Sequence, residues 1–146
     1  MTSKLVFIAC LAATTFMTGV IWFVQVVHYP LMDRVGSDSF DRYHAGHTNT
    51  TSRVVLVPMV VELLTSAWLV FDRPRGFSLN LAILGFVLAT LTWGITFFLS
   101  VPAHNHLSAG FDATWHRSLV VTNIYRALAW TAHSILLLVV TSRQID

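Results

Sequence analysis

The sequence has few charges, one cysteine and no run of basic residues. Lys and Arg number 9 and Asp and Glu 7 among 146 residues, so that 11% of the chain is charged. Scattered basic residues argue against nucleic-acid binding, which needs a basic patch. The single cysteine, Cys10, excludes an internal disulfide and argues against an iron–sulfur cluster. We interpret it as a small packing residue.

Sequence motifs of common enzyme classes are also missing. The chain contains no nucleotide-binding loop, no nucleophile elbow and no HExxH signature of zinc proteases. It consists largely of apolar residues instead, with 55% hydrophobic residues and a mean hydropathy of +0.66. A chain this apolar belongs in a lipid bilayer.

Four stretches are long and apolar enough to cross a membrane, since a spanning helix needs about 20 residues. They are residues 5–27, 54–71, 79–101 and 119–140. The first is too long for the apolar core of a signal peptide, which has about 7–15 residues, so we expect it to be retained. We predict one integral membrane domain, residues 1–146, folded as an all-α, antiparallel four-helix transmembrane bundle.

Local signals predict where these helices begin and end. Pro30 is expected to stop the first helix, because proline lacks a backbone N–H and clashes with the preceding turn. The helical pattern then runs without a break from Ser37 to Phe71, so the second helix should project beyond the membrane, with a kink at Pro58. Asp112 is a candidate N-cap for the fourth helix.

Antiparallel helices would bring six of the seven histidines to one face of the membrane. Imidazole is the commonest side-chain metal ligand, so we predict a metal site there, with Asp112 as a carboxylate ligand. Spacings of three and four residues let one helix present two ligands, as at His44 with His47 and Asp112 with His116. Alternatively, each histidine bridges the apolar and aqueous zones of a membrane interface. The six are His28, His44, His47, His104, His106 and His116.

Two of these histidines, His104 and His106, lie two positions apart and would face different sides of a regular helix. We expect Pro102 to make that helix end irregular and so to relax this objection. Nitrogen and oxygen ligands without thiolate favour iron or copper, with zinc as a further choice.

Polar residues inside the spans fall on common helix faces. On the second helix an arc of about 60° holds such residues, and on the fourth an arc of about 100°. Glu62 and Arg126 should face the bundle interior, because a charge in hydrocarbon is costly, and an ion pair between them is one expectation. With Asn123 they would form a catalytic pocket below the histidines. The alternative is that they only join helices. The two arcs hold His44, His47, Thr51, Pro58, Glu62 and Thr65, and Asp112, His116, Asn123, Arg126, Trp130 and His133.

His133 lies about one membrane leaflet away from the other six histidines. Two interpretations remain open for it. It is either a hydrogen-bonded core residue or an axial ligand that binds haem or a pigment.

Several strings along the chain resemble a group of small bacterial four-helix membrane proteins without an assigned activity. The layout of four spans, Val101-Pro102 near the end of the third and Arg126 on the fourth is also loosely similar to the anthrone-oxygenase-like membrane family. That similarity implies oxidation of a hydrophobic, polycyclic substrate. The strings are QVVHYPL from Gln25, YHAGH from Tyr43, PMVVE from Pro58, VPAH from Val101, GFD from Gly110 and TNIYR from Thr122.

These observations predict a membrane metalloprotein that carries out redox or oxygenase-type chemistry on a hydrophobic small molecule. A non-catalytic subunit that binds haem or a pigment, or docks in a larger membrane complex, is the alternative, and a proton-coupled carrier is a third. A homo-oligomer is compatible with each. We expect the cell inner membrane as the location, and charges near the short second connection favour cytoplasmic termini and an outer histidine face.

Overall fold

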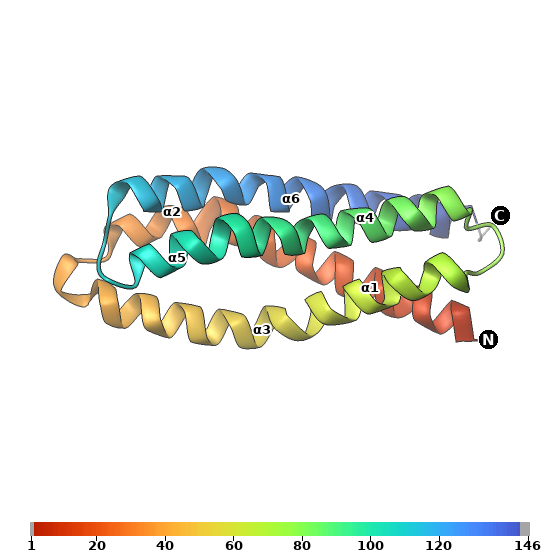
Figure 1. Cartoon of the computed structure of the whole chain (residues 1–146), viewed down its shortest axis with the longest axis horizontal. Coiled ribbons are helices and arrows are strands. Elements are labelled where there is room, and N and C mark those ends of the chain that lie inside the picture. Colours follow the sequence, from red (N-terminus) through yellow and green to blue (C-terminus); the bar gives the residue numbers. More distant parts are fainter. Residues whose placement is uncertain (1, 144–146) are drawn as a thin grey trace.

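The structure, a computed structural model, describes residues 2–143 and consists of four helical rods (Figure 1). No strand occurs within that range, and the predicted all-α four-helix fold is confirmed. The first rod joins α1 (Thr2–Phe23), the π-helical turn η1 (Val24–His28), α2 (Tyr29–Leu31) and the 3₁₀ turn η2 (Met32–Arg34). The others are α3 (Ser37–Phe71), then α4 (Leu79–Ile95) with the π-helical turn η3 (Thr96–Ser100) and α5 (Val101–Leu107), and finally α6 (Ala113–Ser142).

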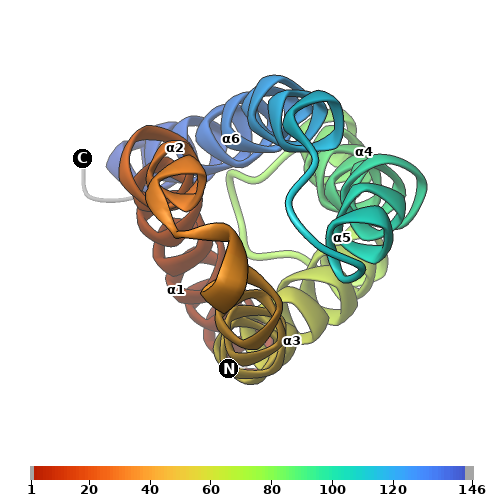
Figure 2. The ribbon, with the colours of Figure 1, turned by 90° about the vertical axis from the view of Figure 1, so that its left-hand side faces the viewer.

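Neighbouring rods run in opposite directions around the bundle. α1 begins and α6 ends at the same end of the molecule, beside the connection between α3 and α4 (Figure 1). In the end view α1 packs against α3 and α6, and α4 packs against the same two helices (Figure 2). The ends of the first and third rods therefore meet the beginnings of α3 and α6 at the opposite end of the bundle.

The outside of the bundle is apolar along the spans, while the start of α3 exposes polar residues such as Asp38, Arg42 and Arg53. Each rod is long and apolar enough to cross a membrane, and large side chains such as Phe71 and Phe98 are 87% and 80% exposed. A continuous apolar surface of this kind is unfavourable in water and suits hydrocarbon. These are the features of a multi-pass membrane protein.

Two prolines distort their rods without ending them. Pro30 and Pro102 each follow a π-helical turn, η1 and η3, and each is followed by further helix. Proline cannot donate to the carbonyl four residues earlier and its ring crowds that carbonyl, so the helix widens locally. The prediction that Pro30 stops the first helix was wrong, as was the expected irregular end after Pro102, where α5 is helical as far as Leu107.

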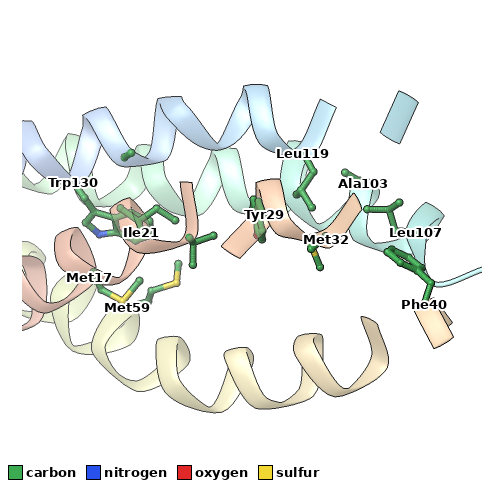
Figure 3. Packing of buried hydrophobic residues seen from close by; sticks show 12 residues of the cluster. Met17, Ile21, Tyr29, Met32, Phe40, Met59, Ala103, Leu107, Leu119 and Trp130 are labelled. Carbon is green, nitrogen blue, oxygen red and sulfur yellow. The ribbon is translucent and has the colours of Figure 1, made fainter. Parts of the chain in front are cut away.

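Apolar side chains form two clusters in the interior. One lies around Met17, Trp130 and Met59 and extends to Phe40 and Leu107 at the far end (Figure 3). The other lies at the end where α1 begins, and its members are Phe7, Cys10, Leu69, Phe77, Ala82, Leu137 and Val140. The polar residues of α3 and α6 that matter below lie within and between these clusters.

The connection before α6 is tightly specified. Asp112 accepts hydrogen bonds from the backbone N–H groups of Thr114 (2.8 Å) and Trp115 (2.9 Å), which confirms it as an N-cap. Gly110 has φ of 131°, a conformation that side-chain-bearing residues rarely adopt. This turn sets the start of α6 and hence the level of His116.

Candidate functional site

Four of the six histidines predicted to share a bundle end come together there. His28 is the last residue of η1, His44 and His47 lie one turn apart near the start of α3, and His104 lies in α5. We call these four residues the histidine quartet. Three rods contribute to it, so the quartet exists only because the antiparallel rods bring these segments to one level.

The quartet is held by two hydrogen bonds between imidazoles. His28 Nε2 lies 2.7 Å from His47 Nδ1, and His44 Nε2 lies 3.0 Å from His104 Nδ1. Ring centroids are 4.5 Å apart for His28 and His47, 5.4 Å for His47 and His104, and 5.2 Å for His44 and His104. His44 and His47 are buried, so the rings meet inside the bundle end and are not spread over its surface.

Tyr29 contacts the quartet, a position that we did not predict from the sequence. Its hydroxyl lies 3.0 Å from His104 Nε2, and its side chain is 4% exposed. In the sequence it is one of several aromatic residues near a membrane interface. The signal that could have identified it is its position between His28 and Pro30, where the distorted helix turns the chain inward.

The other residues predicted as metal ligands have different surroundings. His106 stacks on Trp115 with the ring centroids 3.9 Å apart, because in a regular α5 it points away from His104. His116 is buried, and its Nε2 lies 2.8 Å from the backbone carbonyl oxygen of Tyr29. The carboxylate of Asp112 caps α6. The structure therefore brings these three residues to the same bundle end without joining them to the quartet.

A cavity of about 240 Å³ opens beside the quartet. His47 and His104 line it together with Tyr29 and, on its deeper side, Arg126 of α6. The rest of the lining comes from α3 and from the segment that spans η3 and α5, namely Thr48, Thr51, Ser52, Val55, Thr96, Ser100, Val101 and Asn105. Of the three residues predicted to form a pocket below the histidines, Glu62, Asn123 and Arg126, only Arg126 lines this space.

Asn123 and Arg126 of α6 are both buried. Arg126 Nη1 donates hydrogen bonds to Ser100 Oγ and Asn123 Oδ1, both at 3.3 Å. Asn123 Nδ2 donates to Gln25 Oε1 at 2.9 Å. These bonds connect α6 with the first and third rods. Asn123 does not line the cavity, and it acts on the cavity only through its hydrogen bond with Arg126.

Glu62 belongs to a separate polar group in the middle of the bundle, which we call the Glu62 cluster. Trp130 Nε1 donates to Glu62 Oε2 at 2.6 Å, Thr14 Oγ1 donates to Oε1 at 3.2 Å, and His133 Nδ1 lies 2.8 Å from Oε1. Within residues 2–143 the one contact between a carboxylate and a basic side chain below 4.0 Å is that of Glu62 with His133. The expected ion pair of Glu62 with Arg126 was therefore wrong.

The indole of Trp130 separates these two charged residues. It bonds Glu62 through its nitrogen, while the Arg126 guanidinium carbon lies 5.3 Å from its ring centroid. That arrangement is a cation–π contact, which partly stabilises a buried arginine. Trp130 thus links the cavity to the Glu62 cluster, since its ring contacts Arg126 and its Nε1 donates to Glu62.

His133 is a hydrogen-bonded core residue in this fold. It is 1% exposed, its Nδ1 faces Glu62, and a Cβ added to Gly85 would lie 3.0 Å from its Nε2. Both ring nitrogens therefore face protein groups. The ring has no free side that could approach a macrocycle, which favours the first of the two interpretations of this residue.

Among residues 2–143, no group of three or more His, Cys, Asp or Glu side chains is arranged so that it could hold a metal ion. In the quartet four ring nitrogens bond one another in two pairs, and His104 Nε2 faces the hydroxyl of Tyr29. Among the described residues, His44 Nδ1 is buried without a hydrogen-bond partner. Comparisons of the chain with protein-family models, with curated proteins and with solved structures found no match. The resemblances to small bacterial membrane proteins and to the anthrone-oxygenase-like family stay predictions.

Proposed function

We propose that this chain is a membrane metalloprotein whose histidine quartet binds one transition-metal ion. The ion would serve redox or oxygenase-type chemistry on a hydrophobic molecule held in the cavity between the quartet and Arg126. The observation that carries the proposal is the convergence of four imidazoles from three rods, two of which, His47 and His104, line the cavity.

The spacing of the rings supports this proposal. A metal–nitrogen bond of about 2.1 Å places two imidazole centroids about 5 Å apart when they share an ion. Four of the six ring pairs in the quartet have centroids between 4.5 Å, for His28 and His47, and 6.3 Å, for His44 and His47. Binding an ion would require ring rotations that exchange the two imidazole hydrogen bonds for metal bonds, because no group among residues 2–143 is already arranged to hold one.

Neutral imidazoles suit iron and copper, with zinc as a third choice, and a redox role favours the first two. The bound ion would supply the electron transfer, and dioxygen is the co-reactant that oxygenase-type chemistry would need. Tyr29 would hold a proton next to His104, because its hydroxyl already bonds that ring. Arg126 would orient the substrate, because it lines the same cavity.

The alternative, a subunit that binds haem or a pigment, has less support. Its preferred ligand, His133, has both nitrogens against protein groups. The quartet histidines bond one another at 2.7 and 3.0 Å, which suits a small ion better than a flat macrocycle.

Basic residues at the opposite bundle end support a membrane orientation. Lys4, Arg73, Arg75 and Arg143 line one shallow hollow beside the start of α1. Basic residues close to the ends of spans favour the cytoplasmic side. We therefore propose that this end faces the cytoplasm of a cell inner membrane and that the quartet lies at the outer face.

The test is the metal content of the protein purified in a non-ionic detergent, measured by mass spectrometry together with the visible spectrum. We expect about one iron or copper ion per chain in the wild type and loss of that ion in the double variant His44→Ala, His47→Ala. His106→Ala is the matched control, since His106 stacks on Trp115 outside the quartet, and it should keep the ion.

Three outcomes would overturn the proposal. The first is a wild type without stoichiometric metal after growth with added iron and copper. The second is unchanged metal content in the double variant. The third is a Soret band that accompanies the purified chain, which would support the haem-binding alternative instead.

A further inference from the structure

Arg126 is buried, and no carboxylate among residues 2–143 forms an ion pair with it. Its side chain is 6% exposed, and its recorded hydrogen bonds both leave from Nη1, to neutral oxygens of Ser100 and Asn123. Its Nε is buried without any hydrogen-bond partner. The charge is therefore incompletely paired within the part of the chain that the structure describes.

Such an arrangement is costly unless something else pairs with it. Arginine stays protonated in proteins, and an unpaired charge out of water costs several kcal/mol. The ring of Trp130 offsets part of this cost. The one nearby carboxylate along these helices, Glu62, is already bonded to Thr14, Trp130 and His133. Within residues 2–143 no carboxylate pairs with Arg126, and the cavity gives an anion from outside access to it.

We propose that the cavity beside the quartet binds an amphipathic carboxylate, with its oxyanion on Arg126 and its apolar part toward lipid. A guanidinium donates in a planar fork that matches the two oxygens of a carboxylate. The deep side of the cavity carries Arg126 and the hydroxyl group of Ser100, which would receive the head group.

The size and lining of the cavity set the form of this ligand. About 240 Å³ holds a carboxylate and one or two rings but not a long chain. Val55 and Val101 line it from two different rods, α3 and α5, so an apolar body can leave between those rods into the bilayer. The carboxylate gives orientation, and the apolar body gives access from the membrane.

This inference rests on the proposed function in one respect: it names the substrate class for the same cavity. His47 and His104 line that cavity, so a ligand on Arg126 would place its body beside the quartet. Binding of the carboxylate itself requires no metal. The two proposals can therefore fail separately.

The test is calorimetric titration of chelator-treated protein in a non-ionic detergent with three probes. They are 2-naphthoate, its neutral analogue 2-naphthamide, and acetate, which has the charge without the apolar body. We expect 2-naphthoate to bind about tenfold or more tightly than the amide and acetate to bind far more weakly than 2-naphthoate. The micelle concentration is the same in every titration, so the partition of the probes into detergent affects all variants equally.

Two substitutions locate the effect. Arg126→Gln should remove the preference for the carboxylate, while Arg117→Gln, at an exposed position of the same helix, should keep it. Val55→Trp should fill the cavity and abolish binding of both naphthalene probes with Arg126 still present. This second variant keeps the test decisive if Arg126→Gln does not fold.

Equal affinity of the wild type for 2-naphthoate and 2-naphthamide would overturn the inference. So would an unchanged preference in a folded Arg126→Gln protein, or unchanged binding in Val55→Trp. If the His44→Ala, His47→Ala variant loses metal but keeps the preference, both proposals are supported. If the wild type holds no metal yet prefers the carboxylate, the metal proposal fails alone.

Discussion

Trp130 donates a 2.6 Å hydrogen bond to Glu62 from the far side of the bundle, and this contact fixes α6 against α3. The same indole carries the guanidinium of Arg126 over its ring. Two charged residues that the sequence placed on facing helices are thereby kept apart and given different partners. The bundle consequently has two polar levels, the quartet with its cavity and the Glu62 cluster below.

The Trp130 contact should contribute measurably to stability. Trp130→Phe keeps most of the apolar volume but leaves Glu62 Oε2 without its donor, so we expect the free energy of unfolding to fall by about 1–3 kcal/mol. Denaturation by dodecyl sulfate in mixed micelles measures this. Trp68→Phe is the control, because Trp68 is 52% exposed, and it should change stability by less than about 0.5 kcal/mol. An equal loss of unfolding free energy in Trp130→Phe and Trp68→Phe would contradict the role assigned to the hydrogen bond.

Gly85 and Gly94 form a matched pair on α4. A Cβ at Gly85 would approach His133 Nε2 to 3.0 Å, whereas nothing lies within 4 Å of a Cβ at Gly94. We expect Gly85→Ala to lower the thermal midpoint in detergent by several degrees. Gly94→Ala should be neutral or slightly stabilising, because alanine favours a helix interior by about 1 kcal/mol over glycine. Indistinguishable midpoints would show that His133 can move away freely.

His116 should behave as a structural residue and not as a metal ligand. Its Nε2 lies 2.8 Å from the Tyr29 carbonyl oxygen, near the distorted turn before Pro30. His116→Phe removes this bond at a buried position, and we expect a loss of about 1–3 kcal/mol in the free energy of unfolding with metal content unchanged. Loss of metal from a variant that is otherwise folded would instead place His116 among the ligands.

The proposed orientation can be measured by labelling single cysteines in intact cells. The native Cys10 is 0% exposed and should not react with a membrane-impermeant maleimide. Ser39→Cys lies at the quartet end and Asn80→Cys near the basic end, both at exposed positions. We expect Ser39→Cys to react in intact cells and Asn80→Cys only after the membrane is opened. The reverse pattern would place the quartet on the cytoplasmic side.

Much of the fold was predictable because lipid imposes simple demands. Apolar length identified the four rods, and the cost of charge in hydrocarbon correctly placed Glu62 and Arg126 inside. The antiparallel order of the spans was enough to predict that His28, His44, His47 and His104 lie at the same end of the bundle. The N-cap rule was correct for Asp112. The rule that proline ends a helix was wrong for Pro30, because packing against the neighbouring rods lets the helix widen at a proline and continue.

The sequence by itself determined the membrane fold, the four spans and the bundle end where imidazoles gather, since hydropathy and alternating helix direction act without knowledge of side-chain packing. Only the tertiary structure decided which residues touch: His47 bonds His28, His106 turns out to Trp115, and Trp130 separates Arg126 from Glu62. The reason is that partner choice depends on helix rotation and on the extra turn width at η1 and η3, which shift side chains by ångströms. Periodicity alone does not resolve shifts of that size.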